Sequence, residues 1–120
     1  IHVGQDDLTV ADARRVVGDR AIVGVSTHDE AQVDEALGTT ADYVAVGPIF
    51  GTATKDTGYT ARGLDLVKYA ARRGKPVVAI GGITLDNARS VLEANGMACE
   101  PIQQAAAVLE EADASSSGAR

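Results

Sequence analysis

Four short apolar segments rich in β-branched residues alternate with segments of helical spacing, and this alternation strongly limits the possible folds. The apolar segments cover residues 1–3, 21–25, 43–46 (continuing to 49) and 77–80. The last three are nearly continuous apolar runs, a pattern typical of strands that are buried on both faces. The resulting order, β-α-β-α-β-α-β-α, predicts an α/β fold with a parallel sheet and right-handed crossovers.

Apolar side chains recur at helical spacing between these segments. The predicted stripes are Val10, Ala13, Val16 and Val17; Val33, Ala36 and Leu37; Leu64, Val67, Ala70 and Ala71; and Ala88, Val91 and Leu92. A glycine follows each stripe and can end the helix. Thr27 is expected to cap the second helix in a capping box with Glu30, and Thr84 is expected to cap the fourth. A further helix is expected over residues 102–112, followed by a flexible tail over 114–120.

Chain length decides between an open sheet and a closed barrel. Four β-α units make a small open sheet or half of a (β/α)8 barrel, and a complete barrel needs about 200 residues or more. The chain has 120 residues. It begins at Ile1 and its one methionine is Met97, so we do not expect it to be the unprocessed product of an ordinary start codon.

Charge and composition exclude several classes of protein. A net charge of −6 argues against a general nucleic-acid-binding protein, which needs a basic face. The longest strongly apolar run, residues 77–80, is far shorter than the roughly 20 residues of a membrane span. The single cysteine, Cys99, excludes an intrachain disulfide framework and a cysteine-rich zinc site. The polar, acidic opening does not resemble a signal peptide, so a reducing, cytoplasmic setting is expected.

The segments that follow the predicted strands carry the residues best suited to chemistry. Parallel α/β proteins bind ligands at the carboxyl ends of their strands, so these loops are expected to meet at one end of the sheet. The Gly81-Gly82 pair precedes a helix start, where backbone N–H groups and the helix dipole attract anions. Thr52, Thr54 and Lys55 offer two hydroxyls and a cation on one loop, and Asp7 offers a hard oxygen ligand for Mg²⁺.

Each of these residues also has a purely structural interpretation. A Gly-Gly pair after a strand is often only a tight turn, and a lone lysine such as Lys55 is most often solvated. Asp7 is near a helix start, and Ser26 and Thr27 can both be capping residues. His28 has no nucleophile or carboxylate at a recognisable spacing, so it is assigned to a loop or cap. The functional interpretation therefore depends on the four loops occurring together.

Four segments closely resemble the thiamine phosphate synthase family. They are residues 1–7, 24–26, 42–55 and 78–84, and residues 47–55, Gly-Pro-Ile-Phe-Gly-Thr-Ala-Thr-Lys, are the most specific. The resemblance runs from residue 1 to about 96. It implies a partial TIM barrel over residues 1–96 and a divergent C-terminal segment over residues 97–120.

The resemblance also implies an activity. Members of this family join a hydroxymethylpyrimidine diphosphate to a thiazole phosphate, giving thiamine phosphate and pyrophosphate. The implied roles are Mg²⁺ binding for Asp7, pyrimidine diphosphate binding for Ser26, thiazole phosphate binding for Thr52, Ala53, Thr54 and the Gly82 backbone, and diphosphate binding for Lys55. Lys55 and Ser26 are the implied catalytic residues. Pyrophosphate departs first, so charge neutralisation by Mg²⁺ and Lys55, with the thiazole held in line, would carry the reaction.

The sequence departs from the family pattern at both ends. The family begins about three β-α units earlier, with a Gln-x-Arg-x-Lys segment and an Asn-Asp pair that holds the other Mg²⁺ ligand. Its last strand is replaced here by residues 97–101 without a strand pattern. We therefore expect a fragment of the enzyme, whose half-barrel leaves two sheet edges and an inner face open. Such a chain is expected to be marginally stable, to self-associate and to have little activity.

Two other interpretations remain open. One is a phosphate-ligand-binding half-barrel without catalysis, which the missing Mg²⁺ ligand favours. The other is a relative of the thiazole tautomerases, which share the fold, although the Thr-Ala-Thr-Lys string at residues 52–55 favours the synthase. All three interpretations imply small phosphorylated molecules as ligands.

Overall fold

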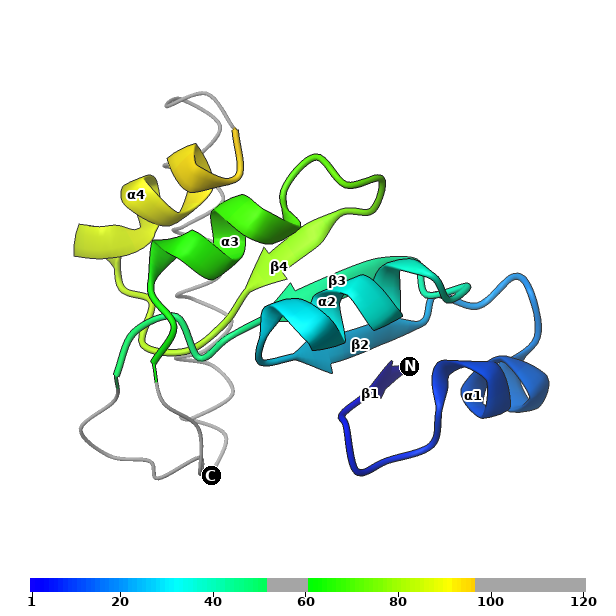
Figure 1. Ribbon diagram of the computed structural model, residues 1–120. Coiled ribbons are helices and arrows are strands. Elements are labelled where there is room, and N and C mark those ends of the chain that lie inside the picture. The colour runs from blue at the N-terminus through cyan, green and yellow to red at the C-terminus, as the bar shows by residue number, and fades with distance from the viewer. Residues whose placement is uncertain (52–60, 97–120) are drawn as a thin grey trace.

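The computed structural model describes residues 1–51 and 61–96, and these form a parallel α/β unit (Figure 1). The elements are β1 (His2–Val3), α1 (Val10–Val17), β2 (Gly24–Thr27), α2 (Glu30–Leu37), β3 (Tyr43–Val46), α3 (Leu64–Ala70), β4 (Val77–Ala79) and α4 (Leu85–Ala94). The predicted order is therefore confirmed. The helix expected over residues 102–112 and the tail after it lie outside the described residues. Of the helices in the described part, none is long and apolar enough to cross a membrane.

All four strands pair in parallel, in the order β1-β2-β3-β4. This order brings the carboxyl ends of the strands to one end of the sheet, as the sequence predicts. The second strand is shifted from its predicted range of 21–25, because Val23 donates its N–H to the Asp42 carboxylate at 2.8 Å and ladder pairing begins at Gly24. The third strand ends at Val46, two residues before Pro48, which has no N–H to donate.

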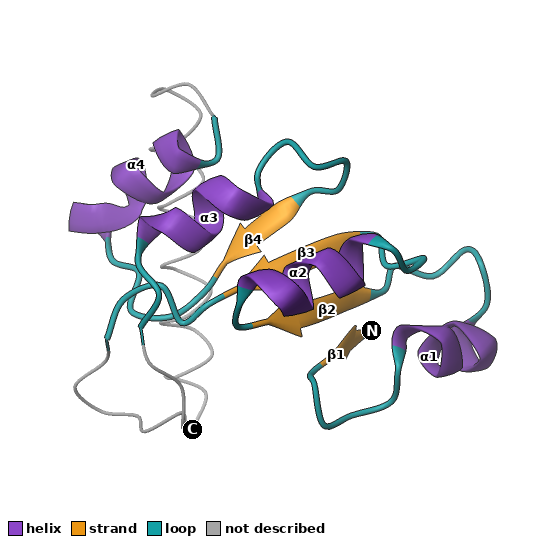
Figure 2. Ribbon diagram, in the orientation of Figure 1, coloured by secondary structure: helices purple, strands orange, loops and turns teal. Residues whose placement is uncertain are grey.

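The two faces of the sheet differ in their cover. Side chains alternate along a strand, and Val3, Val25 and Val44 face the helices and belong to the buried core. Helix α2 lies across β2 and β3 on this side (Figure 2). On the other face, Val78 is 37% exposed, and Ile80 just after β4 is 38% exposed. The prediction of burial on both faces is therefore wrong for β4, whereas Gly24 and Ala45, which lie on this second face in β2 and β3, are buried.

The first two helices differ from prediction in detail. Val16 is 74% exposed, so it does not belong to the buried stripe of α1. At 100° per residue, Val16 lies about 120° around the helix from Val10, whereas Val17 lies close to Val10 in projection. Thr27 does not cap α2: it is a fully buried residue of β2 whose hydroxyl donates to the Ala45 carbonyl at 2.9 Å. Asp29 caps α2 instead, because its carboxylate accepts from the Gln32 N–H at 2.8 Å.

Helix α4 follows its predicted stripe, whereas α3 follows its own only in part: Leu66, which is 1% exposed, is absent from the predicted stripe, and Leu64 and Ala71 are only partly buried. Leu66, Val67 and Ala70 are the buried residues of α3, and Ala88 and Val91 are those of α4. Thr84 caps α4 as predicted, and its N–H donates to the Asn87 side-chain oxygen at 2.8 Å.

A polar cluster that the sequence analysis missed joins the amino ends of the strands. The Arg14 guanidinium donates to the Ala21 carbonyl at 2.5 Å, to the Thr40 carbonyl at 2.7 Å and to the Asp42 carboxylate at 2.9 Å. The Lys75 ammonium donates to the Thr39 and Ala41 carbonyls at 2.9 and 2.6 Å. The Val23 N–H and the Arg14 guanidinium lower the pKa of Asp42. This cluster lies at the end of the sheet opposite the candidate site, so we assign it to stability.

Candidate functional site

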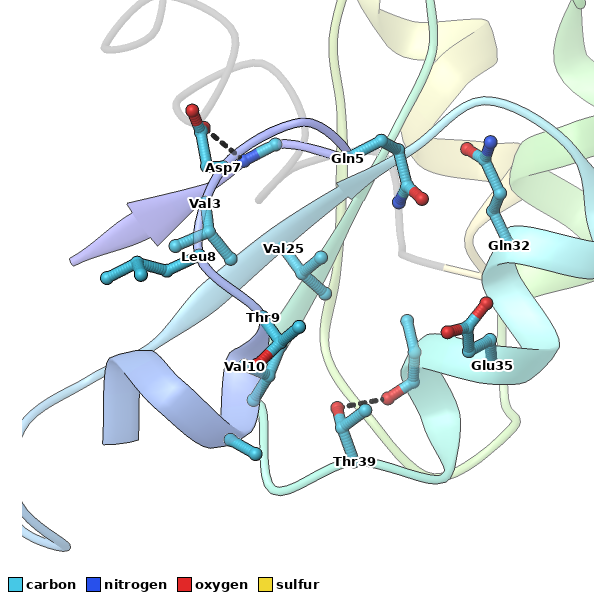
Figure 3. Close-up of a pocket in the computed structure, with 13 residues that line it drawn as sticks. Val3, Gln5, Asp7, Leu8, Thr9, Val10, Val25, Gln32, Glu35 and Thr39 are labelled. Atoms are coloured by element: carbon cyan, nitrogen blue, oxygen red, sulfur yellow. Dashed lines mark hydrogen bonds between the residues drawn. The ribbon is translucent and has the colours of Figure 1, made fainter. Parts of the chain in front are cut away.

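Asp7 lies in a tight turn that follows β1. Its carboxylate accepts from the Gly4 N–H at 2.7 Å, and its own N–H donates to the Gly4 carbonyl at 3.3 Å. Figure 3 shows the carboxylate held against the loop backbone by this bond. The turn thus fixes one carboxylate oxygen, and the second has no protein hydrogen bond among those found in the described part of the chain.

The donor set around Asp7 fits a hard cation only in part. A carboxylate oxygen is the right type of ligand for Mg²⁺, which usually binds one or two carboxylates and completes its shell with water and phosphate oxygens. Within residues 1–51 and 61–96, no group of three or more His, Cys, Asp and Glu side chains is placed to hold a metal ion. Asp7 therefore fits as a single ligand in a shell that other oxygen atoms and water would complete.

Ser26 lies within β2 and is not a capping residue. Its hydroxyl is 2.6 Å from the Nε2 atom of His2, and its carbonyl accepts from the Gln5 side-chain amide at 2.7 Å. Tyr43, on β3, reaches the other nitrogen of the same imidazole. The sequence-based prediction gives no role to His2, Gln5 or Tyr43. A signal was available, because His2 and Tyr43 both belong to strands that precede candidate loops.

The Gly81-Gly82 turn packs directly on the segment that follows β3. The Ile49 N–H donates to the Ile80 carbonyl at 2.9 Å, and the Phe50 N–H donates to the Gly81 carbonyl at 3.0 Å. Gly82 has a φ of +68°, and a Cβ added there would lie 2.9 Å from the Phe50 carbonyl oxygen. Only glycine meets both demands without displacing the backbone.

The same segment is bonded to the residues just before α3. The Arg62 N–H donates to the Pro48 carbonyl at 2.8 Å, and the Gly63 N–H donates to the Ile49 carbonyl at 2.7 Å. The Arg62 guanidinium also forms an ion pair with Glu30 at the start of α2. The predicted site residues Thr52, Ala53, Thr54 and Lys55 lie outside the described residues. The described residues on either side of that stretch meet beside the Gly81-Gly82 turn.

His28 lies in the loop after β2, as the sequence analysis expects. Its Nδ1 atom is 2.7 Å from the Gly47 carbonyl oxygen, and its N–H donates to the Gln32 side-chain oxygen at 2.8 Å. The side chain therefore links the loop after β2 to the end of β3. Ser26 and His28 therefore lie at the end of β2, and the end of β3 separates them from the glycine turn that follows β4.

A groove of about 200 Å³ opens between the start of α1 and α2. Val3, Val10 and Val25 contribute apolar side chains to it, and Gln32 and Glu35 approach from α2 (Figure 3). The groove lies on the helix side of the sheet, whereas Ser26 points to the opposite face. Among the predicted site residues in the described part, only Asp7 borders it.

These features define a class of protein: a parallel β/α protein whose candidate site is assembled from the loops at the carboxyl ends of its strands. A family model described as thiamine monophosphate synthase matches residues 1–100. The chain belongs to this family.

Individual relatives agree with the family assignment. The thiamine-phosphate synthase of Caldicellulosiruptor bescii is 45% identical over 100 residues, which cover 82% of this chain and 45% of that protein. The thiamine-phosphate synthase of Mycolicibacterium vanbaalenii is 51% identical over 96 residues, covering 78% of this chain and 42% of that protein. The structure of a thiamine phosphate pyrophosphorylase from Pyrococcus furiosus matches with a TM-score of 0.68 and 32% identity, covering 78% and 44% of the two chains. The chain thus spans less than half the length of these relatives.

Proposed function

We propose that this chain takes part in thiamine phosphate synthesis, in which hydroxymethylpyrimidine diphosphate is joined to a thiazole phosphate with release of pyrophosphate. The observation that carries the proposal is the contact between two strand ends. Residues 49 and 50, which lead into the Thr-Ala-Thr-Lys stretch, donate their N–H groups to the carbonyls of Ile80 and Gly81. Family membership supports the same reaction.

The proposed architecture is part of a TIM barrel over residues 1–96, followed by a divergent C-terminal segment over residues 97–120. A sheet whose parallel strands follow chain order, with helices on one face, is consistent with consecutive units of such a barrel. The partly exposed face that carries Val78 and Ile80 would be the barrel interior. The proposed setting is cytoplasmic, because one cysteine within these 120 residues offers no intrachain disulfide.

The proposed chemistry needs charge neutralisation and orientation rather than a protein nucleophile. Asp7 would hold Mg²⁺ through its second carboxylate oxygen, and the bound ion would supply positive charge beside the diphosphate. The Lys55 ammonium would neutralise the departing pyrophosphate, and the Ser26 hydroxyl would contact the pyrimidine diphosphate. Thr52, Ala53, Thr54 and the Gly82 backbone would hold the thiazole phosphate in line with the reacting carbon.

A coupling assay tests this proposal. The protein is incubated with both substrates and Mg²⁺, once as the 120-residue chain and once within the whole open reading frame that encodes it. We expect thiamine phosphate and pyrophosphate in equal amounts from the whole frame, with much lower rates from the 120-residue chain. In both forms Lys55→Ala should lower the rate about 100-fold, because it removes the charge beside the leaving group.

The alternatives give different results in the same experiment. Calorimetric binding of a substrate without product from either form would support a phosphate-ligand-binding half-barrel. Isomerisation of the thiazole phosphate without coupling would support a relative of the thiazole tautomerases. If neither substrate is bound or converted, the proposed function is wrong.

The 120-residue chain is also expected to self-associate through its open sheet face and edges. Within residues 1–51 and 61–96, Val78 and Ile80 are partly exposed on this face, and β1 and β4 each pair with a single strand. Such exposed apolar side chains and strand edges favour association with a second copy. Light scattering after size-exclusion chromatography should give a mass above that of one chain. The Val78→Lys variant should have a lower mass in the same measurement. Val16→Lys is the matched control, since Val16 is exposed on α1, away from this face. A cooperatively melting monomer would contradict the expectation.

A further inference from the structure

Three side chains form a continuous hydrogen-bonded chain across β1, β2 and β3. The Tyr43 hydroxyl is 2.9 Å from His2 Nδ1, and His2 Nε2 is 2.6 Å from the Ser26 hydroxyl. The rings of His2 and Tyr43 are stacked, with centroids 5.7 Å apart and an interplanar angle of 28°. These three side chains lie on the sheet face opposite the helices. The series of hydrogen bonds ends at the Ser26 hydroxyl, which we place in the substrate site.

Gly24 makes this arrangement possible. It pairs in register with His2 on one side and with Tyr43 on the other. A Cβ at position 24 would lie 1.9 Å from Cζ of the Tyr43 ring. The phenol therefore occupies the space above Gly24, and this placement lets its hydroxyl cross β2 to reach the imidazole.

The direction of these two hydrogen bonds follows from the chemistry of the phenol, the imidazole and the alcohol. A neutral imidazole has one N–H donor and one accepting nitrogen, so only two arrangements exist. A phenol O–H is a stronger donor and a weaker acceptor than an alcohol, because its oxygen lone pair is delocalised into the ring. Tyr43 therefore donates to Nδ1 of His2, the imidazole proton resides on Nε2, and Nε2–H donates to the Ser26 oxygen.

We propose that Tyr43 and His2 are positioning residues that present the Ser26 hydroxyl to the ligand as a hydrogen-bond donor. With its oxygen occupied by Nε2–H, Ser26 retains its own O–H for an acceptor atom. The matching ligand atom carries a lone pair and no proton, such as a diphosphate oxygen or a pyrimidine ring nitrogen. Gln5 fixes the carbonyl of the same residue at 2.7 Å, so the backbone is held as well. The choice of these ligands rests on the proposed function.

The imidazole tautomers test the hydrogen-bond order without any assay of activity. The chain has two histidines, and long-range proton–nitrogen NMR spectra at a pH where both are neutral distinguish the nitrogens. His2 is expected as the Nε2–H form. His28 is the internal control: its Nδ1 is 2.7 Å from the Gly47 carbonyl, which only accepts, so it is expected as the Nδ1–H form. Tyr43→Phe should weaken the preference of His2 for the Nε2–H tautomer and leave the tautomer of His28 unchanged.

Kinetics test whether this order serves the substrate. In the whole open reading frame, Tyr43→Phe should raise KM for the pyrimidine diphosphate about 3- to 10-fold, with KM for the thiazole phosphate unchanged. His2→Leu should raise the same KM at least as much. His2→Gln should recover part of the loss, because its amide can accept from Tyr43 and donate to Ser26.

Either measurement can overturn the proposal. An Nδ1–H tautomer on His2 would reverse the hydrogen-bond order, and Ser26 would then be presented as an acceptor. Equal changes of both KM values would indicate a general structural role for His2 and Tyr43. If the wild-type protein makes no thiamine phosphate, the proposed function is wrong, whereas the tautomers still decide the order of donors.

Discussion

Replacing Arg14 by methionine is expected to lower the free energy of unfolding by about 2–4 kcal/mol and the melting temperature by at least about 10 °C. The side chain is 12% exposed, and it donates to three backbone carbonyls and to the Asp42 carboxylate. Methionine keeps much of the volume but removes every donor. Each hydrogen bond to a charged group contributes about 1.5–3 kcal/mol to the free energy of unfolding. The net loss is smaller than the sum, because water can bind the more exposed acceptors once the guanidinium is removed.

Arg15→Met is the matched control for this prediction. Arg15 follows Arg14 on the same helix, but its side chain is 85% exposed and its one ion pair, with Asp12, spans 3.9 Å. An exposed pair of this kind contributes little to stability. Urea unfolding followed by circular dichroism should therefore separate the two variants clearly. Equal losses for Arg14→Met and Arg15→Met would show that the Arg14 cluster does not hold the strand ends together.

The stabilising effect of Asp42 should depend on pH. The Val23 N–H and the Arg14 guanidinium stabilise the carboxylate, so its pKa is lower in the folded chain than in the unfolded one. Its contribution is therefore fully present above the unfolded-state pKa of about 4 and is lost as the pH falls through the folded-state pKa. Asp42→Asn should be less stable than wild type at pH 7, and the difference should shrink in acid. A constant difference across this range would rule out the ionised carboxylate as its source.

The alternation of apolar runs and helical stripes predicts the element order and the parallel sheet, because the spacing of apolar residues depends directly on which side chains each element buries. It does not predict which polar groups end an element. Thr27 fits a helix cap in the sequence, yet it is buried in β2, and Asp29, two residues further along, caps the helix. Both residues have suitable side chains, and only the register of β2 against β3 decides between them. Local pattern carries no information about that register.

In the candidate site, too, the features set by local sequence can be predicted and those set by strand pairing cannot. Asp7 and the Gly81-Gly82 pair can be found from the sequence, because strand ends and glycine turns leave local signals. The contacts of His2 with Ser26 and Tyr43 cannot, since the residues are 24 and 41 positions apart and meet only through pairing of three strands. The Arg14 cluster is hidden for the same reason, because its partners come from separate loops.

Gly82→Ala is expected to lower kcat/KM for the coupling reaction about 100-fold, an effect of the size produced by displacing a substrate-holding segment by about 1 Å. Two causes act together. A φ of +68° costs an alanine about 1–2 kcal/mol, and the new Cβ would lie 2.9 Å from both the Cβ and the carbonyl oxygen of Phe50. Because these contacts include the backbone carbonyl oxygens of Phe50 and Gly51, the turn and the segment leading to residues 52–55 must separate.

Gly18→Ala separates the two causes. Gly18 has a φ of +84°, but a Cβ there meets no atom within 4 Å, and it lies at the end of α1, away from the strand-end loops. Gly18→Ala should lose only the stability that a positive φ costs, and Gly82→Ala should lose more because of the added clash. Only Gly82→Ala should lose activity and affinity for the thiazole phosphate. Circular dichroism establishes that each variant is folded. If Gly82→Ala keeps the activity of Gly18→Ala, the close approach of the two strand-end loops serves the fold alone, because a segment that holds substrate could not move apart without loss of rate.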